Sequence, residues 1–507
     1  MDKLVQRLPQ ALKWLAGAAA GAFILCALAI ALSRVAWPWQ LEWMEGGSLQ
    51  QVERLRAGQE LYQAPTVEFT PFIYPPLYFE LAAQLPATPA TPFLPMRALS
   101  IAAWLISLLL IAQLVFRWTG SSWWSLFGAG VYAACFELGG GWFDLARVDS
   151  LALMFLLAGW LALEERHTGE GAPWWRHLLA TVFLLAAFLA KQSSLVVALP
   201  LVVYTLLLQQ GLRRWLFPAT YLVGLSALVV VLNRLSSGWF NYYVFELPAG
   251  HALEPSALAG FWRFDLLGPL PFVILATLFT LVRLLFTRKD RQLAWLLALG
   301  MAFVGSAWLG RLHSGGYLNV LLPAFAFLAV WGARSLHHLL EPAFDDPFTA
   351  FRQLPTENTE HLRDTLVLLA CVLQFALLVY DPRDHLPRPA DDRGGRELRA
   401  WVDAQPGALW LPTQGWLVTG KSGHGAAHEM ALQDVLRGPD SPVRTKLDQE
   451  LKQALARGRW TAIVLDRPWL TQEMENGYLQ IPSPLPPGSL RPVTGMETRP
   501  TMFMLQR

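Results

Sequence analysis

The chain carries a series of apolar runs that recur from its N-terminus to about residue 380. Each run is about 17–22 residues long, and roughly 20 apolar residues in a helix cross a hydrocarbon core of ~30 Å. Only 15% of the 507 residues are charged, whereas soluble domains carry roughly 25%. One signal peptide does not explain so many runs. The sequence therefore predicts an all-α polytopic membrane protein.

The composition also excludes several classes of partner and site. A formal net charge of +2 gives no large basic field, so we expect no nucleic acid to bind. All three cysteines lie within apolar runs, which favours neither a disulfide framework nor a thiolate metal site; they are Cys26, Cys135 and Cys371. We interpret them as small core residues.

The positive-inside rule gives an orientation for the predicted helices. The first span, from about Leu15 to Val35, follows the basic residues Lys3, Arg7 and Lys13, which places the N-terminus in the cytoplasm. Further runs centre near residues 107, 130, 156, 184, 201, 225, 275, 300, 325 and 372, so we expect about eleven transmembrane helices. An odd number of crossings places the C-terminus outside.

Basic links between the runs agree with this alternation and fall on the cytoplasmic side. They are Arg117, Arg166 with Arg176, Arg213 with Arg214, Arg288 with Lys289 and Arg291, and the link from Arg334 to Arg363. The least certain step is the link from Lys191 to Ser194, because two short spans there are also consistent with one long broken helix. Losing one span would reverse the orientation of everything after it.

Two segments are too polar to cross, and both fall outside the membrane on the extracytoplasmic side. One is the first outer loop, at about residues 37–95, within a transmembrane domain that spans residues 1–380. The other is the tail, residues 381–507, which combines a helix-like stretch at residues 443–456 with a strand-like run at residues 461–465. We expect the tail to form a small extracytoplasmic α/β domain.

The first outer loop opens with a pair of acids in Glu42-Trp43-Met44-Glu45-Gly46-Gly47. Carboxylates three residues apart share one face of a helical turn. Such a pair suits a general base that positions a hydroxyl and accepts its proton. A solvated loop face is the alternative, and spacing alone favours it.

An aromatic and proline-rich element follows in the same loop. It runs from Leu61-Tyr62 to Tyr74-Pro75-Pro76-Leu77-Tyr78, and its consecutive prolines fix an extended turn. Tyr62, Tyr74 and Tyr78 are candidates to line a cavity for a sugar or a prenyl chain. The alternative is an ordinary aromatic belt at the membrane interface.

Cations recur at outer ends of the predicted spans, where the positive-inside rule expects few. Arg147, with Asp144 and Asp149 beside it, begins the span after the second outer loop, and Lys191 ends a later apolar run. Arg311 and His313, in a segment that continues to Asn319, repeat the pattern at the ninth span. Local pairing or snorkelling explains any one of them. Three occurrences together favour a binding site for an anion.

A lipid phosphate or pyrophosphate leaving group is an anion that needs such cations. Arg and Lys stabilise the charge that develops on its oxygens as a glycosidic bond breaks. Acids and cations together thus predict a sugar-transfer site. No nucleotide-binding fingerprint occurs in the cytoplasmic links, which disfavours a soluble nucleotide-sugar donor. The tail histidines His424 and His428 lack a clear third ligand, so we expect neither a metal nor another cofactor.

The order of these motifs over residues 1–380 resembles that of bacterial GT-C membrane glycosyltransferases related to protein O-mannosyltransferases and to the lipid A aminoarabinose transferase. The resemblance implies a catalytic carboxylate in the outer loop, a polyprenyl-phosphate sugar donor, and inversion at the anomeric carbon. It assigns Glu42 or Glu45 as the base, with a slight preference for Glu42. It implies that Arg147 and Lys191 bind the donor phosphate, with Arg311 as a weaker third. The family commonly has an aspartate at the acidic site, where this chain has glutamates.

The resulting prediction is an inverting glycosyltransferase of the bacterial inner membrane that acts on its outer face. It transfers a sugar from a polyprenyl phosphate to a lipid, glycan or protein acceptor. The cavity would also include Asp149, His313 and Asn319. A transporter or flippase of lipid-linked saccharides is one alternative, although the charges lie at span ends rather than at mid-span. A non-catalytic envelope scaffold is another, because the usual aspartate is absent.

Overall fold

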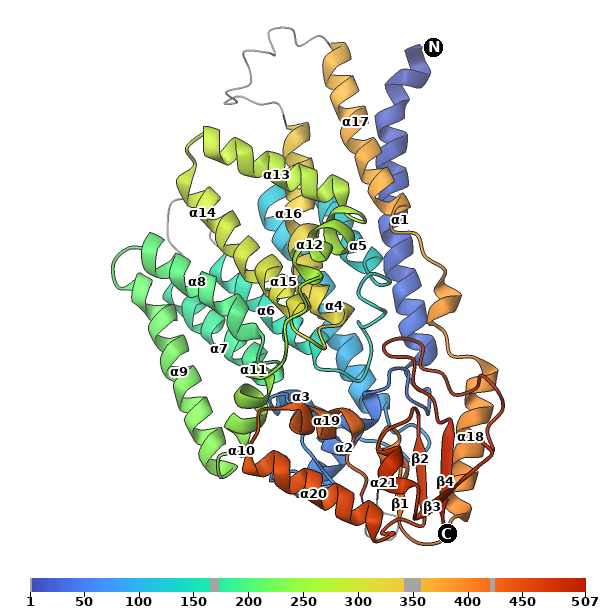
Figure 1. Ribbon diagram of the computed structural model, residues 1–507. Coiled ribbons are helices and arrows are strands. Elements are labelled where there is room, and N and C mark those ends of the chain that lie inside the picture. The colour runs from blue at the N-terminus through green and yellow to red at the C-terminus, as the bar shows by residue number, and fades with distance from the viewer. Residues whose placement is uncertain (1, 165–172, 342–356, 420–424) are drawn as a thin grey trace.

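The computed structural model describes residues 2–164, 173–341, 357–419 and 425–507. Arg166, His424 and part of the link from Arg334 to Arg363 lie outside these ranges, and the side chain of Lys3 is not described. Figure 1 shows a tall helical bundle with a smaller unit of helices and strands at one end. The N-terminus lies at the opposite end of the molecule from this unit.

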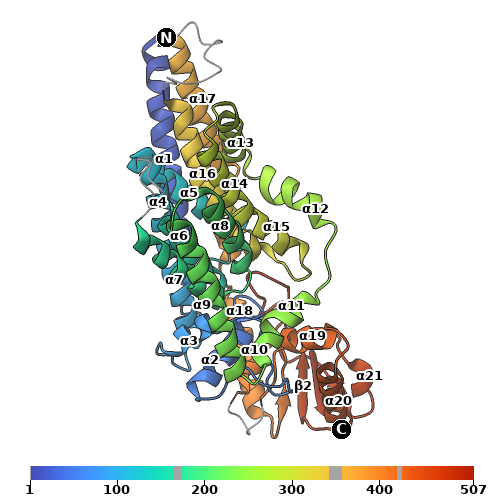
Figure 2. The same ribbon diagram turned by 90° about the vertical axis from the view of Figure 1, so that its left-hand side faces the viewer.

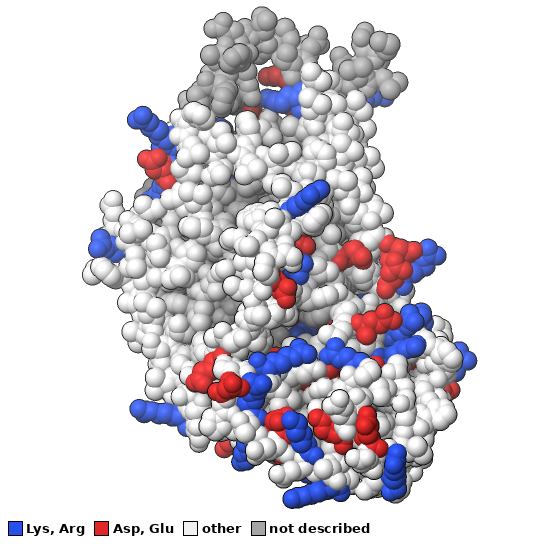
Figure 3. Space-filling view, viewed as in Figure 1, with Lys and Arg blue, Asp and Glu red and all other residues white. Residues whose placement is uncertain are grey.

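The apolar runs form the helices of the bundle, as predicted. Their boundaries are α1 (Asp2–Arg34), α4 (Leu94–Thr119), α5 (Ser122–Ala134), α6 (Asp149–Leu163), α7 (Trp174–Ala190), α8 (Ser194–Leu208), α9 (Arg213–Leu235), α13 (Pro271–Phe286), α14 (Asp290–Leu299), α15 (Gly305–Leu312), α16 (Leu322–Leu340) and α17 (Glu357–Ala376). A π-helical turn, η3 (Gly300–Val304), joins α14 to α15. Figure 3 shows few charged side chains over much of the bundle, as expected for a surface in contact with lipid.

The helices of the bundle are less regular than the eleven membrane-spanning helices that the sequence predicts. In the described part of the chain, five helical segments are each long and apolar enough to cross a membrane. A sixth is possible only as a bent pair, because Ala257–Leu267 meets α13 at 103°. The run predicted near residue 275 is therefore not one straight helix, and α6, α7 and α8 are shorter than a typical span. The count of eleven stays a prediction.

The chain reverses direction at Lys191–Ser193, between α7 and α8. At this end Lys191 pairs with Asp149, the first residue of α6. At the other end Tyr204 of α8 packs on Trp295, whose indole donates to Glu164 just after α6. The two helices thus form a hairpin rather than one broken helix.

The first outer loop is folded and carries two helices, α2 (Glu45–Arg56) and α3 (Leu77–Ala83). A second irregular segment follows α9 and contains α10 (Trp239–Asn241), the π-helical turn η1 (Tyr242–Glu246) and α11 (Leu247–Ala249). The short α12 (Ala257–Gly260) and π-helical η2 (Phe261–Leu267) lead from it to α13. The first outer loop and the segment from α10 to α11 lie beside the C-terminal unit in Figures 1 and 2.

The C-terminal unit is a small α/β structure, as predicted. Its elements are η6 (Pro382–His385), α18 (Pro389–Ala404), β1 (Leu409–Trp410), η7 (Gly415–Leu417), α19 (Glu429–Arg437), α20 (Pro442–Ala456), β2 (Ala462–Leu465), α21 (Thr471–Met474), β3 (Tyr478–Ile481) and β4 (Met502–Gln506). The strand order is β1-β2-β4-β3. Strands β1 and β2 are parallel, and the other two pairs are antiparallel.

The C-terminal unit shares its apolar core with the first outer loop. Trp416 packs on Phe93 and Trp39, with ring centroids 5.1 Å and 6.2 Å apart. Gly47 explains how α2 approaches so closely, because a Cβ there would lie 2.2 Å from the Phe72 ring and 2.8 Å from His428. The loop and the tail therefore fold against each other, although more than 280 residues separate them in the chain.

Candidate active site

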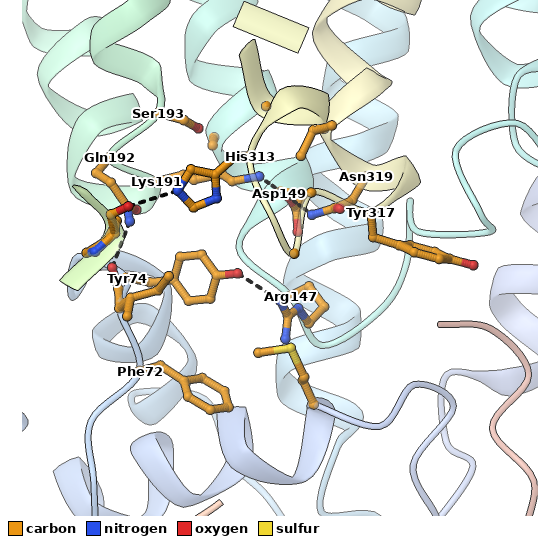
Figure 4. Close-up of a pocket in the computed structure, with 18 of the residues that line it drawn as sticks. Phe72, Tyr74, Arg147, Asp149, Lys191, Gln192, Ser193, His313, Tyr317 and Asn319 are labelled. Carbon is orange, nitrogen blue, oxygen red and sulfur yellow. Dashed lines mark hydrogen bonds and ion pairs between the residues drawn. The ribbon is translucent and has the colours of Figure 1, made fainter. Parts of the chain in front are cut away.

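A cavity of about 860 Å³ lies where the bundle, the first outer loop and the C-terminal unit meet. Seven of the predicted site residues line it: Glu42, Tyr74, Arg147, Asp149, Lys191, His313 and Asn319. They come from separate stretches of the chain, and Figure 4 shows several of them facing one space. Apolar side chains of α6, α8 and α15 line the part of the wall that the bundle supplies.

Glu42 is a buried carboxylate with one oxygen left unpaired. Oε2 accepts a hydrogen bond from the Met44 amide at 3.1 Å and lies 3.8 Å from Arg147 Nη1. Among the described residues, Oε1 has no hydrogen-bond partner. Burial raises the pKa of Glu42 to about 8, and the positive charge of Arg147 opposes that rise. The raised pKa brings the titration of Glu42 close to neutral pH, as suits a general base.

Glu45 is buried too, but both of its oxygens are occupied. They accept from the guanidinium of Arg97 at 2.6 Å and 3.0 Å and from the amides of Leu41 and Ala146 at 2.7 Å. Burial alone would raise the pKa of Glu45, but the charge and hydrogen bonds of Arg97 and the hydrogen bonds from the two amides together outweigh burial, so the pKa falls. Glu45 does not line the cavity. It ties the Glu42 loop to the segment that carries Arg147.

Arg147 has donor groups at the same cavity that make no hydrogen bond. Its Nη2 donates to the Tyr74 hydroxyl at 2.9 Å, as Figure 4 shows. In the described part of the structure, its Nε and Nη1 make no hydrogen bond although both are buried. A buried guanidinium with free donors is costly unless a ligand satisfies it. The arrangement suits an anion with several oxygens, such as a phosphate.

Lys191 and Asn319 converge on Asp149. The Lys191 ammonium lies 2.6 Å from Asp149 Oδ1, and Asn319 Nδ2 donates to the same oxygen at 2.8 Å. Trp142 donates to the other oxygen of Asp149 at 3.1 Å. Asp149 therefore orients the two side chains beside Arg147, and Lys191 remains partly open to the cavity.

Besides Glu45, three predicted residues lie away from the cavity wall. The Tyr62 hydroxyl donates to the Tyr74 carbonyl at 2.7 Å, and that of Tyr78 donates to the Met96 carbonyl at 2.9 Å. Arg311 pairs with Asp265 at 2.8 Å and donates to the Gly316 carbonyl. These contacts hold the loops near Tyr74 and His313 in place. The three residues therefore support the cavity wall and do not themselves line it.

The sequence alone did not single out two features of the site. The first is Arg97, the partner of Glu45. Like Arg147, it is a cation at the predicted outer end of a span, where the positive-inside rule expects few. The second feature is the part of the cavity wall that α19 forms, which includes Gln433 and Asp434. The helical periodicity of α19 is evident in the sequence, but nothing local shows that one face meets the bundle.

The described residues include no group of three or more His, Cys, Asp or Glu side chains arranged to hold a metal ion. His428 is instead buried. Its Nδ1 accepts from the Met430 amide and its Nε2 donates to the Trp43 carbonyl. Its partner in the predicted pair, His424, is outside the described ranges.

The fold and the cavity define a class of polytopic membrane proteins with a folded outer loop, a C-terminal α/β unit and a buried charged site between them. Comparison with solved structures shows that the fold is similar to that of ArnT. The crystal structure of ArnT from Cupriavidus metallidurans bound to undecaprenyl phosphate superposes with a TM-score of 0.52. The match covers 95% of this chain and 98% of that one, at 15% sequence identity. No protein-family model matches the sequence, and no curated protein matches it significantly.

Proposed function

We propose that this protein is an inverting glycosyltransferase that takes a sugar from a polyprenyl phosphate. The main observation is that an unpaired oxygen of Glu42 and the unpaired donors of Arg147 are buried at the wall of one cavity. A base and an anion site are the two groups that sugar transfer from a phosphate requires. The fold shared with an ArnT that was solved with undecaprenyl phosphate supports a lipid donor of this kind.

In the proposed reaction, the acceptor hydroxyl oxygen attacks the anomeric carbon from the side opposite the phosphate. Glu42 accepts the hydroxyl proton as the new C–O bond forms. The bond from the anomeric carbon to the phosphate oxygen breaks, and its electron pair leaves with the polyprenyl phosphate. Arg147 and Lys191 stabilise the charge that develops on that oxygen. One displacement inverts the anomeric centre.

The cavity also suits the lipid part of such a donor. Its bundle side is lined by Leu153, Leu156, Val197, Leu309 and Val320, which bury a prenyl chain favourably. The charged end lies beside the folded loop and the C-terminal unit, on the side that the basic links predict to be extracytoplasmic. We therefore place the reaction at the outer face of a bacterial inner membrane. The acceptor is a lipid, a glycan or a protein.

Transfer from synthetic polyprenyl-phosphate hexoses in proteoliposomes tests the proposal. We expect Glu42→Gln to lower the transfer rate by roughly 10²–10⁴-fold, the range of general-base catalysis. Glu53→Gln is the matched control, because Glu53 lies in α2 with a side chain that is 41% exposed and away from the cavity. Full transfer activity of Glu42→Gln would exclude Glu42 as the base, and movement of the lipid without sugar transfer would favour a flippase.

A further inference from the structure

One face of α19 is polar and turns into the cavity. Met430, Gln433, Asp434 and Arg437 follow at spacings of three, one and three residues, which places them on one side of a helix. All four line the cavity. The other side of α19 packs into the apolar core of the C-terminal unit through Ala431, Leu432 and Val435. The helix therefore has a buried apolar face and a second face that serves the cavity.

The polar face is held in a fixed position against the proposed base. His428 caps α19 by accepting from the Met430 amide at 3.2 Å, and its Nε2 donates to the Trp43 carbonyl at 3.0 Å. Trp43 is the residue next to Glu42. Burial lowers the pKa of His428 to about 4, so the ring is neutral at physiological pH and the contact does not titrate there. A ligand on α19 thus lies beside the Glu42 loop.

The side chains of this face carry mixed polarity. Asp434 is 5% exposed and lies 3.4 Å from His251 Nε2. The ring of His251 packs on His313, with centroids 4.7 Å apart. Arg437 is exposed and forms no hydrogen bond or ion pair with the residues that the structure describes. One carboxylate, one guanidinium and one amide give the face no net charge, unlike the cation pair at Arg147 and Lys191.

This combination matches the chemistry of sugar hydroxyls. Each hydroxyl both donates and accepts, so neighbouring hydroxyls pair with a carboxylate, an amide and a guanidinium at once. Phe72 and Phe245 also line the cavity and offer aromatic surface for the apolar face of a sugar ring. An anionic ligand would instead meet the carboxylate of Asp434, which disfavours it.

We propose that Gln433, Asp434 and Arg437 on α19 form a saccharide subsite in the same cavity as the proposed donor-phosphate site. This inference rests on the proposed function and gives the C-terminal unit a role in it. The bound saccharide is either the sugar of the donor or a glycan acceptor, since both present the same hydroxyls.

Binding measurements on the full-length protein in nanodiscs test the subsite and separate the two sources. The probes are polyprenyl phosphate, polyprenyl-phosphate hexoses, and a panel of neutral trisaccharides that includes maltotriose, mannotriose and chitotriose. The variants are Asp434→Asn and Arg437→Gln. The second substitutes an exposed side chain, so it keeps the test valid if the first variant misfolds. Asp448→Asn is the control, because Asp448 lies in α20 with a side chain that is 41% exposed.

We expect both variants to bind polyprenyl phosphate normally and to lose roughly tenfold or more in affinity for a saccharide, as for a lost hydrogen bond to a charged group. Loss for the polyprenyl-phosphate hexose assigns the donor sugar, and loss for a trisaccharide assigns a glycan acceptor. Unchanged affinity for every saccharide in both variants would overturn the subsite. A wild-type protein that binds no polyprenyl phosphate would instead contradict the proposed function.

Discussion

Glu42 and Glu45 have identical side chains, but their different surroundings suit them to different roles. Glu45 has every oxygen occupied, whereas Glu42 keeps an unpaired oxygen at the cavity wall.

The raised pKa of Glu42, about 8 because of burial, gives a prediction for the reaction. A general base must be deprotonated, so kcat/KM should rise about tenfold per pH unit below pH 8 and level off above. A pH-rate profile on both sides of that pKa checks this, and a flat profile would contradict it.

The Glu45–Arg97 pair should be required for stability rather than for proton transfer. Both side chains are fully buried and their charged atoms lie 2.6 Å apart. Glu45→Ala leaves a buried, unpaired guanidinium, which costs about 3–5 kcal/mol. We expect a clear drop in the thermal unfolding temperature in detergent. The exposed Glu53→Ala should leave it nearly unchanged, and equal unfolding temperatures for the two variants would show that the pair stabilises little.

The cations of the candidate site could be singled out from the sequence because they break a general rule. Arg147 and Lys191 stood out because cations at outer span ends are exceptions to the positive-inside rule, and both line the cavity. The sequence did not distinguish the roles of Glu42 and Glu45. One hydrogen bond that Glu45 accepts comes from the Ala146 amide, 101 residues away. Distant partners of this kind leave no local pattern in the sequence.

At the scale of elements, the segment before β4 lies directly over Glu42. The Val493 amide donates to the Leu41 carbonyl at 2.8 Å, and Gly495 adopts a φ of +83°. A Cβ at Gly495 would lie 3.0 Å from Glu42 Cγ and 3.2 Å from its Oε1. The C-terminal unit therefore helps to position the proposed base.

Gly495→Ala should displace the Glu42 carboxylate. We expect a lower kcat and a shifted midpoint in the pH-rate profile, with KM for the donor nearly unchanged. Gly488→Ala is the control, because Gly488 has a similar φ of +72° but a Cβ there would meet no atom closer than 3.8 Å. Backbone strain is common to both variants. Equal effects of the two substitutions on the pH midpoint would show that strain alone is responsible.

Elements were predictable where a simple pattern marks them. The bundle helices follow from the length and apolar content of the runs, and the α/β character of the tail follows from its helix-like and strand-like stretches. The bend of 103° before α13 did not, because apolar content alone does not distinguish a straight helix from a broken one. The polar face of α19 has a clear period, but the sequence does not show that it meets the bundle.

At the scale of the whole molecule, the proposed reaction requires the first outer loop and the C-terminal unit to lie on the extracytoplasmic side. Cysteine labelling in intact and permeabilised cells checks this orientation. Asp440→Cys, at a side chain that is 98% exposed in the C-terminal unit, should react with an impermeant maleimide applied from the extracytoplasmic side. Lys289→Cys, in an exposed link at the other end, should react only after the membrane is opened. The reverse pattern would refute the proposed topology.

The proposed site depends on a carboxylate and cations from distant parts of the chain meeting around a lipid-linked phosphate. A cryo-EM structure of the protein with polyprenyl phosphate measures this most directly. We predict the phosphate in the cavity, within hydrogen-bonding reach of Arg147 and beside Lys191, with the prenyl chain along the apolar wall of α6 and α8. A phosphate bound elsewhere in the molecule, with the donors of Arg147 still unpaired, would contradict the proposal.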